Sequence, residues 1–479
     1  MITDSLSLEE IKILKYIDSE KENLLKSLKR IVSFNSVKES PIYLEETFLP
    51  YGKAIGDCLK DTLSLCNELG FETKNIKNYM GYTKYSSVQH NSENSNDSTT
   101  DEYIAALGHL DVVPAGDGWK FPPFSCEISE GNIYGRGVLD NKGPILASLY
   151  ALKAIKDANV SLKREIRIIF GCDEENGFSD IPHYLNEEKP PFAGFTPDCK
   201  FPVVYGENGS VRLGVEFFKN NPKSSSNLYE LKSIKGDFSK AHVPDYAEVD
   251  ILDKNGNFLK YKAYGKKAPS NNPYLGKNAI IEVLSLIPQN ILDNLDFSEE
   301  IKLILKYFSD CYGKGLNIDY HSEQTGSLLM NFYDLSLDLN KKKLILKTSI
   351  RYPIDLIFQI ENTKLNTNQK VIHVNNIKDQ LPKTNIFIEN FMPAVFQNKD
   401  SKMVKIMSSA YSNITGLNSD PVTTTGGTYA KVFPNILAFG PSFPGEKGIA
   451  HNNDEYISID SLMNICRIYA IALYRLSQS

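Results

Sequence analysis

Features that would place a protein in a membrane or on nucleic acid are scarce in this sequence. No stretch approaches the ~18 consecutive apolar residues that a membrane-spanning helix needs. Segment 1–30 mixes acids and lysines with apolar residues and lacks the apolar core of a signal peptide. The net charge is −6 and no basic block occurs, which argues against nucleic acid as a partner. We therefore expect a cytoplasmic protein without a membrane or nucleic-acid partner.

Patterned cysteines are also missing. The seven cysteines are scattered along the chain and form no Cys-x-x-Cys pair. An odd, unpatterned set suits a reducing compartment better than a disulfide framework. Cys172 and Cys199 stand beside acidic clusters and could bind metal, but the favoured interpretation makes them small residues packed in a core.

A chain of 479 residues is too long for one ordinary core, which indicates two domains, or three. Apolar strands at 103–107 and 166–170 flank a helical pattern at 144–158, and this alternation predicts an α/β sheet. Ligands gather at the carboxyl ends of strands in such sheets. Further helices are expected at 7–33, 51–69, 402–414 and 459–476, and further strands at 202–205 and 436–439. The polar segment 86–100 predicts a surface loop in which His90 is solvated.

The pattern of predicted strands and helices changes near 206–209, and the first pattern returns near 390. Between these points, strand-like segments surround helical ones, which predicts an α+β unit. The predicted strands are 212–219, 247–252 and 344–352, and the predicted helices are 278–287 and 291–308. The expected fold class is α/β, with a mixed central sheet flanked by helices and interrupted by the inserted α+β domain. The predicted boundaries are 1–208 and 389–479 for the first domain and 209–388 for the inserted one.

Metal-ligating side chains follow the ends of the apolar segments. Side chains alternate along a strand, so the first strand places an imidazole and a carboxylate on one side of the chain. The set comprises His109, Asp111, Asp140, Asp173-Glu174-Glu175, Asp198 and His451. Zinc takes imidazole and carboxylate ligands, and two neighbouring zinc ions need a bridging group. Two histidines, one bridging carboxylate and two terminal ones fit a dinuclear site, with one carboxylate left for proton transfer from an activated water.

The order of these fragments resembles the dinuclear zinc peptidases that include aminoacylase, carnosinase and the glutamate-releasing carboxypeptidases. Bacterial PepV-type dipeptidases are the most similar group. The resemblance covers nearly the whole chain. The matching stretches are GHLDVVPAGDGW (108–119), IYGRGVLDNKGP (133–144), GCDEENG (171–177), GFTPD (194–198), FPVVYGENG (201–209), TTTGGTYA (423–430) and AFGPSFPGEKGIAHNNDEYI (438–457).

The resemblance implies a role for each residue of the metal set. Asp140 is the bridging ligand, His109 and Asp198 bind one metal, and Glu175 and His451 bind the other. Glu174 is the general base and acid, with Asp111 as its supporting partner, and the peptide bond after Asp140 is a non-proline cis bond. The inserted domain is a lid over the catalytic domain. In this lid, Arg351 matches an arginine that grips the substrate carboxylate. Outside it, the loop Gly426, Gly427, Thr428 matches one that meets the substrate backbone.

Two lid segments depart from the family pattern. The family has a histidine in a G-K-x-A-H-A-x-x-P segment, where this chain has Pro269, and an asparagine in N-M-V-P-D, where it has Ala241. The missing histidine stabilises the developing oxyanion in the family, and loss of one such donor typically costs about 10²–10³ in rate. His242 could compensate only if its loop were shifted.

Three functions follow from this pattern. The leading hypothesis is a monomeric cytoplasmic metallo-dipeptidase, a hydrolase that cuts short peptides with two divalent ions. Zinc is the expected metal, and manganese or cobalt suit the same ligands. An N-acyl-amino-acid deacylase would use the same chemistry with a different pocket. A metal-binding paralogue with little turnover is the non-enzymatic alternative, favoured by Pro269 and Ala241.

Overall fold

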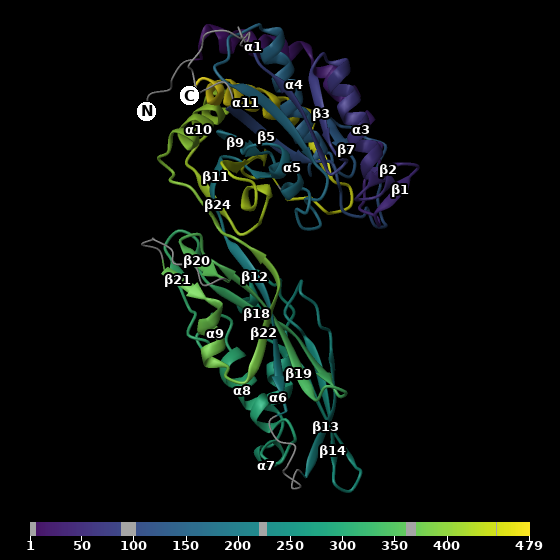
Figure 1. Cartoon of the computed structure of the whole chain (residues 1–479), viewed down its shortest axis with the longest axis vertical. Helices are drawn as coiled ribbons and strands as arrows, with labels where there is room; N and C mark the ends of the chain where they lie inside the picture. Colours follow the sequence, from purple (N-terminus) through teal and green to yellow (C-terminus); the bar gives the residue numbers. More distant parts are fainter. Residues whose placement is uncertain (1–5, 88–101, 220–227, 361–369, 447) are drawn as a thin grey trace. The chain divides into compact units, whose positions relative to one another are not determined.

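The computed structural model describes residues 6–87, 102–219, 228–360, 370–446 and 448–479. The chain divides into two compact units (Figure 1). Unit 1 contains Met1–Gly206, Gln397–Val422 and Thr428–Ser479, and unit 2 contains Glu207–Phe396 and Thr423–Gly427. Unit 2 thus interrupts unit 1, and the expected fold class is confirmed. The predicted loop at 86–100, with His90, lies almost wholly outside the described residues.

A mixed sheet forms the centre of unit 1. Seven strands of this nine-stranded sheet run in the order β11-β25-β9-β5-β8-β4-β3. The four in the middle, β25, β9, β5 and β8, are parallel, and the flanking pairs are antiparallel. Every residue of β5 is buried, as its unbroken apolar run predicts for a central parallel strand. The bounds are β3 Glu72–Ile76, β4 Met80–Tyr85, β5 Tyr103–His109, β8 Glu165–Gly171, β9 Ala193–Thr196, β11 Val203–Glu207 and β25 Ile436–Phe439.

Helices α4 and α11 pack against each other and against β5 and β8. The helix α4, Lys142–Asp157, is buried on almost all sides. Its apolar residues therefore lie all around the helix and are not confined to one face. Its N-terminus lies just after Asp140, so the helix anchors that candidate ligand. The remaining helices of unit 1 are α1 Leu8–Ser19, α2 Lys21–Val32, α3 Lys53–Glu68, α5 Ile181–Glu187, α10 Lys402–Thr415 and α11 Ile459–Ser477. Its short strands are β1 Ile42–Leu44, β2 Thr47–Leu49, β6 Glu127–Ser129, β7 Asn132–Tyr134, β10 Cys199–Lys200, β26 Pro441–Ser442 and β27 Tyr456–Ser458. The strand β24, Val422–Thr424, begins with the last residue of a unit 1 segment and continues into unit 2.

Unit 2 is an α+β domain whose two larger sheets are antiparallel, in the orders β18-β19-β12-β22 and β13-β14-β15. The strands are β12 Gly209–Phe218, β13 Tyr229–Gly236, β14 Tyr246–Asp253, β15 Phe258–Tyr264, β18 Leu329–Asp338, β19 Lys343–Tyr352 and β22 Thr384–Met392. The predicted boundary between residues 388 and 389 falls inside β22, which pairs with β12. The helices are α6 Ala279–Ser285, α7 Gln289–Leu292, α8 Ser298–Phe308 and α9 Val374–Gln380, and the shorter strands are β16 His321–Ser322, β17 Gly326–Ser327, β20 Leu356–Gln359, β21 Lys370–His373 and β23 Val395–Phe396.

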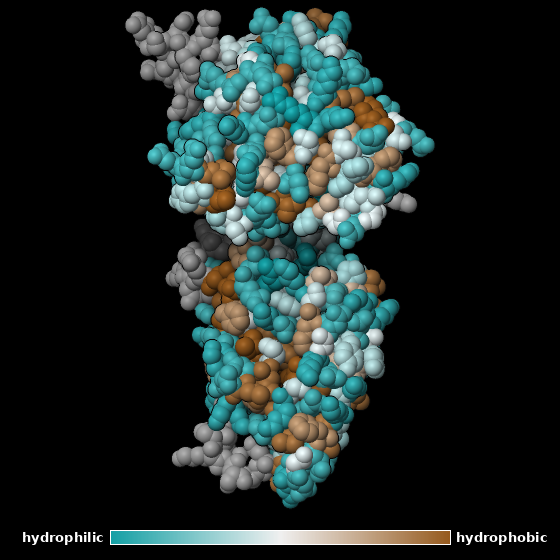
Figure 2. Space-filling model, turned by 90° about the vertical axis from the view of Figure 1, so that its right-hand side faces the viewer, coloured by the Kyte–Doolittle hydropathy of each residue, from teal (hydrophilic) through white to brown (hydrophobic). Residues whose placement is uncertain are grey.

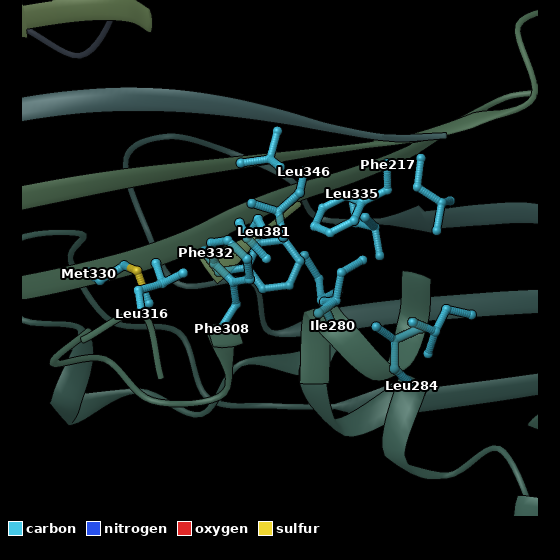
Figure 3. Packing of buried hydrophobic residues seen from close by; sticks show 14 of the residues in the cluster. Phe217, Ile280, Leu284, Phe308, Leu316, Met330, Phe332, Leu335, Leu346 and Leu381 are labelled. Carbon is cyan, nitrogen blue, oxygen red and sulfur yellow. The ribbon is translucent and has the colours of Figure 1, made fainter. Parts of the chain in front are cut away.

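The core of unit 2 lies between its sheets and helices α6 and α8. Figure 3 shows Ile280 and Leu284 of α6 beside aromatic and aliphatic side chains from the sheet, with Phe308 of α8 next to Phe332. All of these side chains are 0–3% exposed. Burial on this scale supplies a core that belongs to unit 2 alone.

One face of each unit carries mostly polar side chains (Figure 2). Figure 2 shows hydrophilic residues over most of this face of each unit, with smaller hydrophobic patches between them. Among the helices that the structure describes, none has both the length and the apolar character needed to cross a bilayer.

Candidate metal centre

The ends of two parallel strands bring the first candidate residues together. His109, the last residue of β5, lies opposite Gly171, the last residue of β8. The residues that follow each strand are therefore neighbours. The Asp111 carboxylate accepts the backbone N–H of Glu174 at 3.2 Å and that of Glu175 at 3.1 Å. Asp111 thus holds the acidic turn by its backbone, which leaves both glutamate side chains free for other contacts.

The imidazole of His109 is fixed from behind. Its Nδ1 lies 2.8 Å from the main-chain oxygen of Asp111 and 3.3 Å from Oδ1 of the same residue. Its Nε2 lies 3.0 Å from Oδ1 of Asp140 and 3.7 Å from Oδ2 of Asp198. A proton on Nδ1 satisfies the carbonyl and directs Nε2 towards the carboxylates, which is the usual arrangement of a histidine ligand.

Asp140 lies between two imidazoles. One of its oxygens faces His109, and the other, Oδ2, lies 3.0 Å from Nε2 of His451. The same Nε2 lies 2.9 Å from Oε1 of Glu175. The bond Asp140–Asn141 is cis, as the resemblance implies. A carboxylate with each oxygen facing a different imidazole has the geometry of a bridging ligand.

Asn141 connects three of these segments. Its Oδ1 accepts the backbone N–H of His109 at 3.2 Å. Its amide nitrogen donates to the main-chain oxygen of Pro197 at 2.5 Å and to Oδ1 of Asp198 at 3.4 Å. Gly108 makes the approach possible, because a Cβ there would lie 2.2 Å from the Asn141 oxygen. The side chain of Asn141 is fully buried, and no role was predicted for it from the sequence.

The two histidines and Asp140 stabilise one another's charged forms. Burial lowers the pKa of His109, but the hydrogen bonds to Asp111 and Asp140 outweigh it and raise that pKa well above its usual range. Hydrogen bonds to Asp140 and Glu175 raise the pKa of His451 to about 10. Burial raises the pKa of Asp140, yet the two histidines lower it overall. The carboxylates therefore favour a positive charge at this place.

The other carboxylates repel one another. Burial and the negative charge of Asp198 raise the pKa of Glu174 well above its usual range. Burial and the charge of Asp140 raise the pKa of Asp198 to about 7. So many acids gathered in one place cost free energy unless cations offset their charge.

The donor set fits divalent cations. Ligand atoms of His109, Asp140 and Glu175 lie within 4.8 Å of one another, and so do those of His109, Glu174 and Asp198. Imidazole nitrogen with carboxylate oxygen suits zinc, manganese or cobalt. Cys172 and Cys199 belong to neither group; Cys172 is fully buried and its backbone N–H donates to Asp180.

A second buried carboxylate holds the start of the acidic turn. Oδ2 of Asp180 accepts the backbone N–H groups of Cys172 at 2.8 Å and Asp173 at 3.2 Å, and the hydroxyl of Tyr429 at 2.5 Å. A Cβ on Gly171 would lie 2.1 Å from that hydroxyl oxygen, so only glycine fits there. Asp180 and Tyr429 were not predicted from the sequence, since neither lies in a ligand-like spacing. The one available signal was an Asp seven residues after Asp173.

The remaining candidate residues lie in two places. Arg351, in β19, donates from Nη1 to the main-chain oxygen of Thr425 at 3.1 Å, next to Gly426 and Gly427. Thr428 caps the following short helix by accepting the N–H of Ala430. The two departures from the family pattern are neighbours, because His242 pairs with Pro269 in an antiparallel bridge and Ser270 donates its N–H to Ala241.

Residues 105–475 match peptidase family M20/M25/M40. The chain belongs to this peptidase family. A relative from Bacillus subtilis (strain 168), named "Putative dipeptidase YtjP", is 30% identical over 96% of this chain and 98% of its own length. The expectation of a hydrolase of the peptidase type is confirmed.

Solved structures share the fold. Human carnosine dipeptidase 1 is 16% identical and covers 99% of this chain and 100% of its own, with a TM-score of 0.57. The Bacillus subtilis YXEP protein, described as a dinuclear metal-binding peptidase from the M20 family, is 9% identical, with a TM-score of 0.50 over 95% of this chain and 99% of its own. The predicted roles of individual residues stay predictions.

Proposed function

We propose that this M20 member is a metal-dependent dipeptidase. The observation that carries the proposal is Asp140, whose two oxygens each lie 3.0 Å from Nε2 of a different histidine. This arrangement is what a carboxylate shared by two metal ions requires. The relatives named as dipeptidases support the substrate class.

Two divalent ions would be held by the set around Asp140. His109 and Asp198 would bind one ion, and Glu175 and His451 would bind the other, with Asp140 shared. Zinc suits these ligands, and manganese and cobalt suit them too. Such ions polarise the scissile carbonyl and make water acidic enough to attack at neutral pH.

Glu174 would carry the proton. Its carboxyl group lies with His109 and Asp198, and its raised pKa suits a group that takes a proton from water and gives it to the leaving nitrogen. Asp111 fixes its position by holding its backbone N–H. Glu174 and Glu175 divide the work, because the Glu175 carboxylate faces His451 instead.

Arg351 would bind the carboxylate of the substrate. Its guanidinium can form two parallel hydrogen bonds with a carboxylate, which selects peptides by the position of the C-terminus. The contact with the oxygen of Thr425 joins Arg351 to the loop with Gly426 and Gly427, which would meet the substrate backbone together with Thr428.

The low-turnover alternative rests on the paired lid segments. Pro269 has no N–H and no side-chain donor, and Ala241 offers only its backbone. The ring of His242 contacts the oxygen of Val243 at 3.2 Å and lies 3.8 Å from Asp237, so it already has local partners. We propose slow turnover relative to family members that keep both donors.

We further propose that the protein acts as a monomer in the cytoplasm. All seven cysteines are free, and five of them are buried, which suits a reducing compartment.

A substrate panel tests the function. The metal-loaded protein is assayed with dipeptides, the same dipeptides with an amidated C-terminus, and N-acyl amino acids. We expect hydrolysis of the free dipeptides and a loss of at least about 10²-fold on amidation, because Arg351 then has no carboxylate to bind. Faster hydrolysis of N-acyl amino acids would favour a deacylase, and no turnover at full metal occupancy would favour the inactive paralogue.

A further inference from the structure

Glu455 binds the turn that carries Asp140. Its Oε1 accepts three backbone N–H groups, those of Gly137 at 3.0 Å, Leu139 at 2.9 Å and Asp140 at 3.1 Å. Its Oε2 accepts a hydrogen bond from Nη1 of Arg136 at 2.7 Å. One carboxylate thus accepts hydrogen bonds from three backbone N–H groups of a turn that has no regular secondary structure of its own.

This anchor is fully enclosed. Glu455 is 0% exposed and Arg136 is 1% exposed. Arg136 also stacks over Trp119, with its guanidinium carbon 5.1 Å from the ring centroid. Buried polar groups of this kind have no water to replace a lost partner, so removing the carboxylate would leave three N–H groups and a guanidinium unsatisfied.

Glu455 also belongs to the segment that carries His451. It stands four positions after that histidine and directly before β27, which pairs with β7. Its main-chain oxygen accepts the N–H of Gly135 at 2.9 Å. Asp140 and Glu455 are 315 residues apart in the sequence, yet these bonds make the two segments one structural piece.

We propose that Glu455 is a positioning residue that sets the place of Asp140 relative to His451. It touches neither substrate nor metal. Its carboxylate fixes the backbone of the bridging ligand to the loop of the terminal ligand, so that both side chains reach the same ion. The inference rests on the proposed function, since it assumes that Asp140 and His451 bind metal.

Metal titration of the stripped, full-length protein tests this role. Calorimetry with Zn²⁺ gives the number and affinity of the ions, and the visible spectrum of the Co²⁺-loaded protein reports their coordination. We expect two ions in the wild type. In Glu455→Gln, which keeps the shape but not the charge, we expect a 10- to 100-fold loss of affinity at one of them and an altered Co²⁺ spectrum, as for other residues that orient ligands.

The matched control is Glu446→Gln. Glu446 is an exposed carboxylate on the same C-terminal segment, and it accepts the N–H of Phe443 and the hydroxyl of Ser461 without touching the Asp140 turn. We expect wild-type affinity and spectrum. Circular dichroism and thermal melting show that each variant is folded.

Arg136→Lys serves if Glu455→Gln does not fold. The lysine keeps the positive charge but moves the donor away from Oε2. We expect a smaller loss of affinity for the same ion. The inference alone would be overturned if a folded Glu455→Gln variant bound two ions with the wild-type affinity and spectrum. If only Arg136→Lys folds, the same result in that variant would overturn it. A wild type that binds no metal would overturn the proposed function and the inference with it.

Discussion

Neighbouring glutamates have different partners in the acidic turn. Glu175 faces His451, while the carboxyl group of Glu174 lies with Asp198 and His109. The division follows from Asp111, which holds both backbone N–H groups and so fixes the direction of each side chain. The chemistry proposed for Glu174 therefore depends on a residue that need not touch the substrate.

Replacing Glu174 with Gln tests its role as the proton carrier. We expect kcat for dipeptide hydrolysis to fall by about 10²–10⁴, because the amide cannot accept and return a proton. Metal stoichiometry should stay at two ions, measured by elemental analysis after dialysis. Asn176→Ala, in the same turn but outside the cluster, should hydrolyse dipeptides at the wild-type rate. A Glu174→Gln variant within a few-fold of wild type would contradict the role.

Asp180 connects stability to pH. Burial raises its pKa to about 7 in the folded chain, against about 3.8 when exposed. The folded state therefore favours the protonated form, and this contribution is fully present below about pH 3.8 and is lost as the pH rises to about 7. At about 1.4 kcal/mol per pH unit, the loss between pH 5 and 7 is roughly 2–3 kcal/mol.

Asp180→Asn cannot ionise, so its stability should depend less on pH. We expect the difference in unfolding free energy between variant and wild type to shift in favour of the variant from pH 5 to pH 7. Urea unfolding of the metal-free proteins, followed by the fluorescence of Trp119 in unit 1, measures it. Equal pH dependence in both proteins would contradict the expected pKa.

At the scale of elements, regular segments were predictable from the sequence and their interruptions were not. The strands at β5, β8 and β25 and the helices α4 and α11 follow from apolar periodicity. In place of the predicted helix at 291–308 there are two helices, α7 and α8. They are separated because Asp296, between them, accepts the N–H of Leu231 and forms an ion pair with Lys219. The predicted helix at 7–33 is likewise α1 and α2. The break before α8 depends on contacts across the fold that leave no periodic signal in the sequence.

The candidate site divides in the same way. The resemblance identified the candidate ligands because ligand residue types recur in a fixed order, and the structure brings His109, Asp140, Glu175, Asp198 and His451 together. Asn141, Asp180 and Glu455 hold the turns in place through backbone N–H and C=O groups, and Tyr429 and Arg136 donate to the carboxylates of Asp180 and Glu455. Backbone groups are the same in every residue, so these contacts leave no motif.

The paired lid segments invite restoration of the missing donors. We expect the double variant Ala241→Asn with Pro269→His to raise kcat for dipeptides by about 10-fold or more, because a side-chain donor would again stabilise the oxyanion. The KM should change less than kcat, since the new contact forms in the transition state. Steady-state kinetics measure both. Unchanged turnover in the double variant would contradict the idea that the lid limits this enzyme.

At the scale of the whole molecule, the insertion leaves and rejoins unit 1 at adjacent points. The N–H of Gln397 donates to the oxygen of Tyr205 at 2.9 Å, directly beside the crossings at 206/207 and 396/397. A core separate from that of unit 1 lies within unit 2. All five candidate metal ligands lie in unit 1, whereas Arg351 lies in unit 2.

Removing the insertion should separate metal binding from catalysis. We expect a variant in which a flexible linker of about six Gly and Ser residues replaces 207–396 to fold and to bind two ions. Dipeptide hydrolysis should fall by at least about 10³-fold, because no arginine holds the substrate in register. Circular dichroism, calorimetry and activity assays check the three parts. Hydrolysis near the wild-type rate would contradict the role given to unit 2.

Activity as a function of bound metal shows whether hydrolysis needs both ions. The protein is stripped with a chelator and titrated with Zn²⁺, Mn²⁺ or Co²⁺ while hydrolysis of a dipeptide is followed. We expect no activity without metal and a rise that ends at two ions per chain, because Asp140 lies between two sets of ligands. Activity that survives complete removal of metal, or no activity at two bound ions of any of the three metals, would contradict the account.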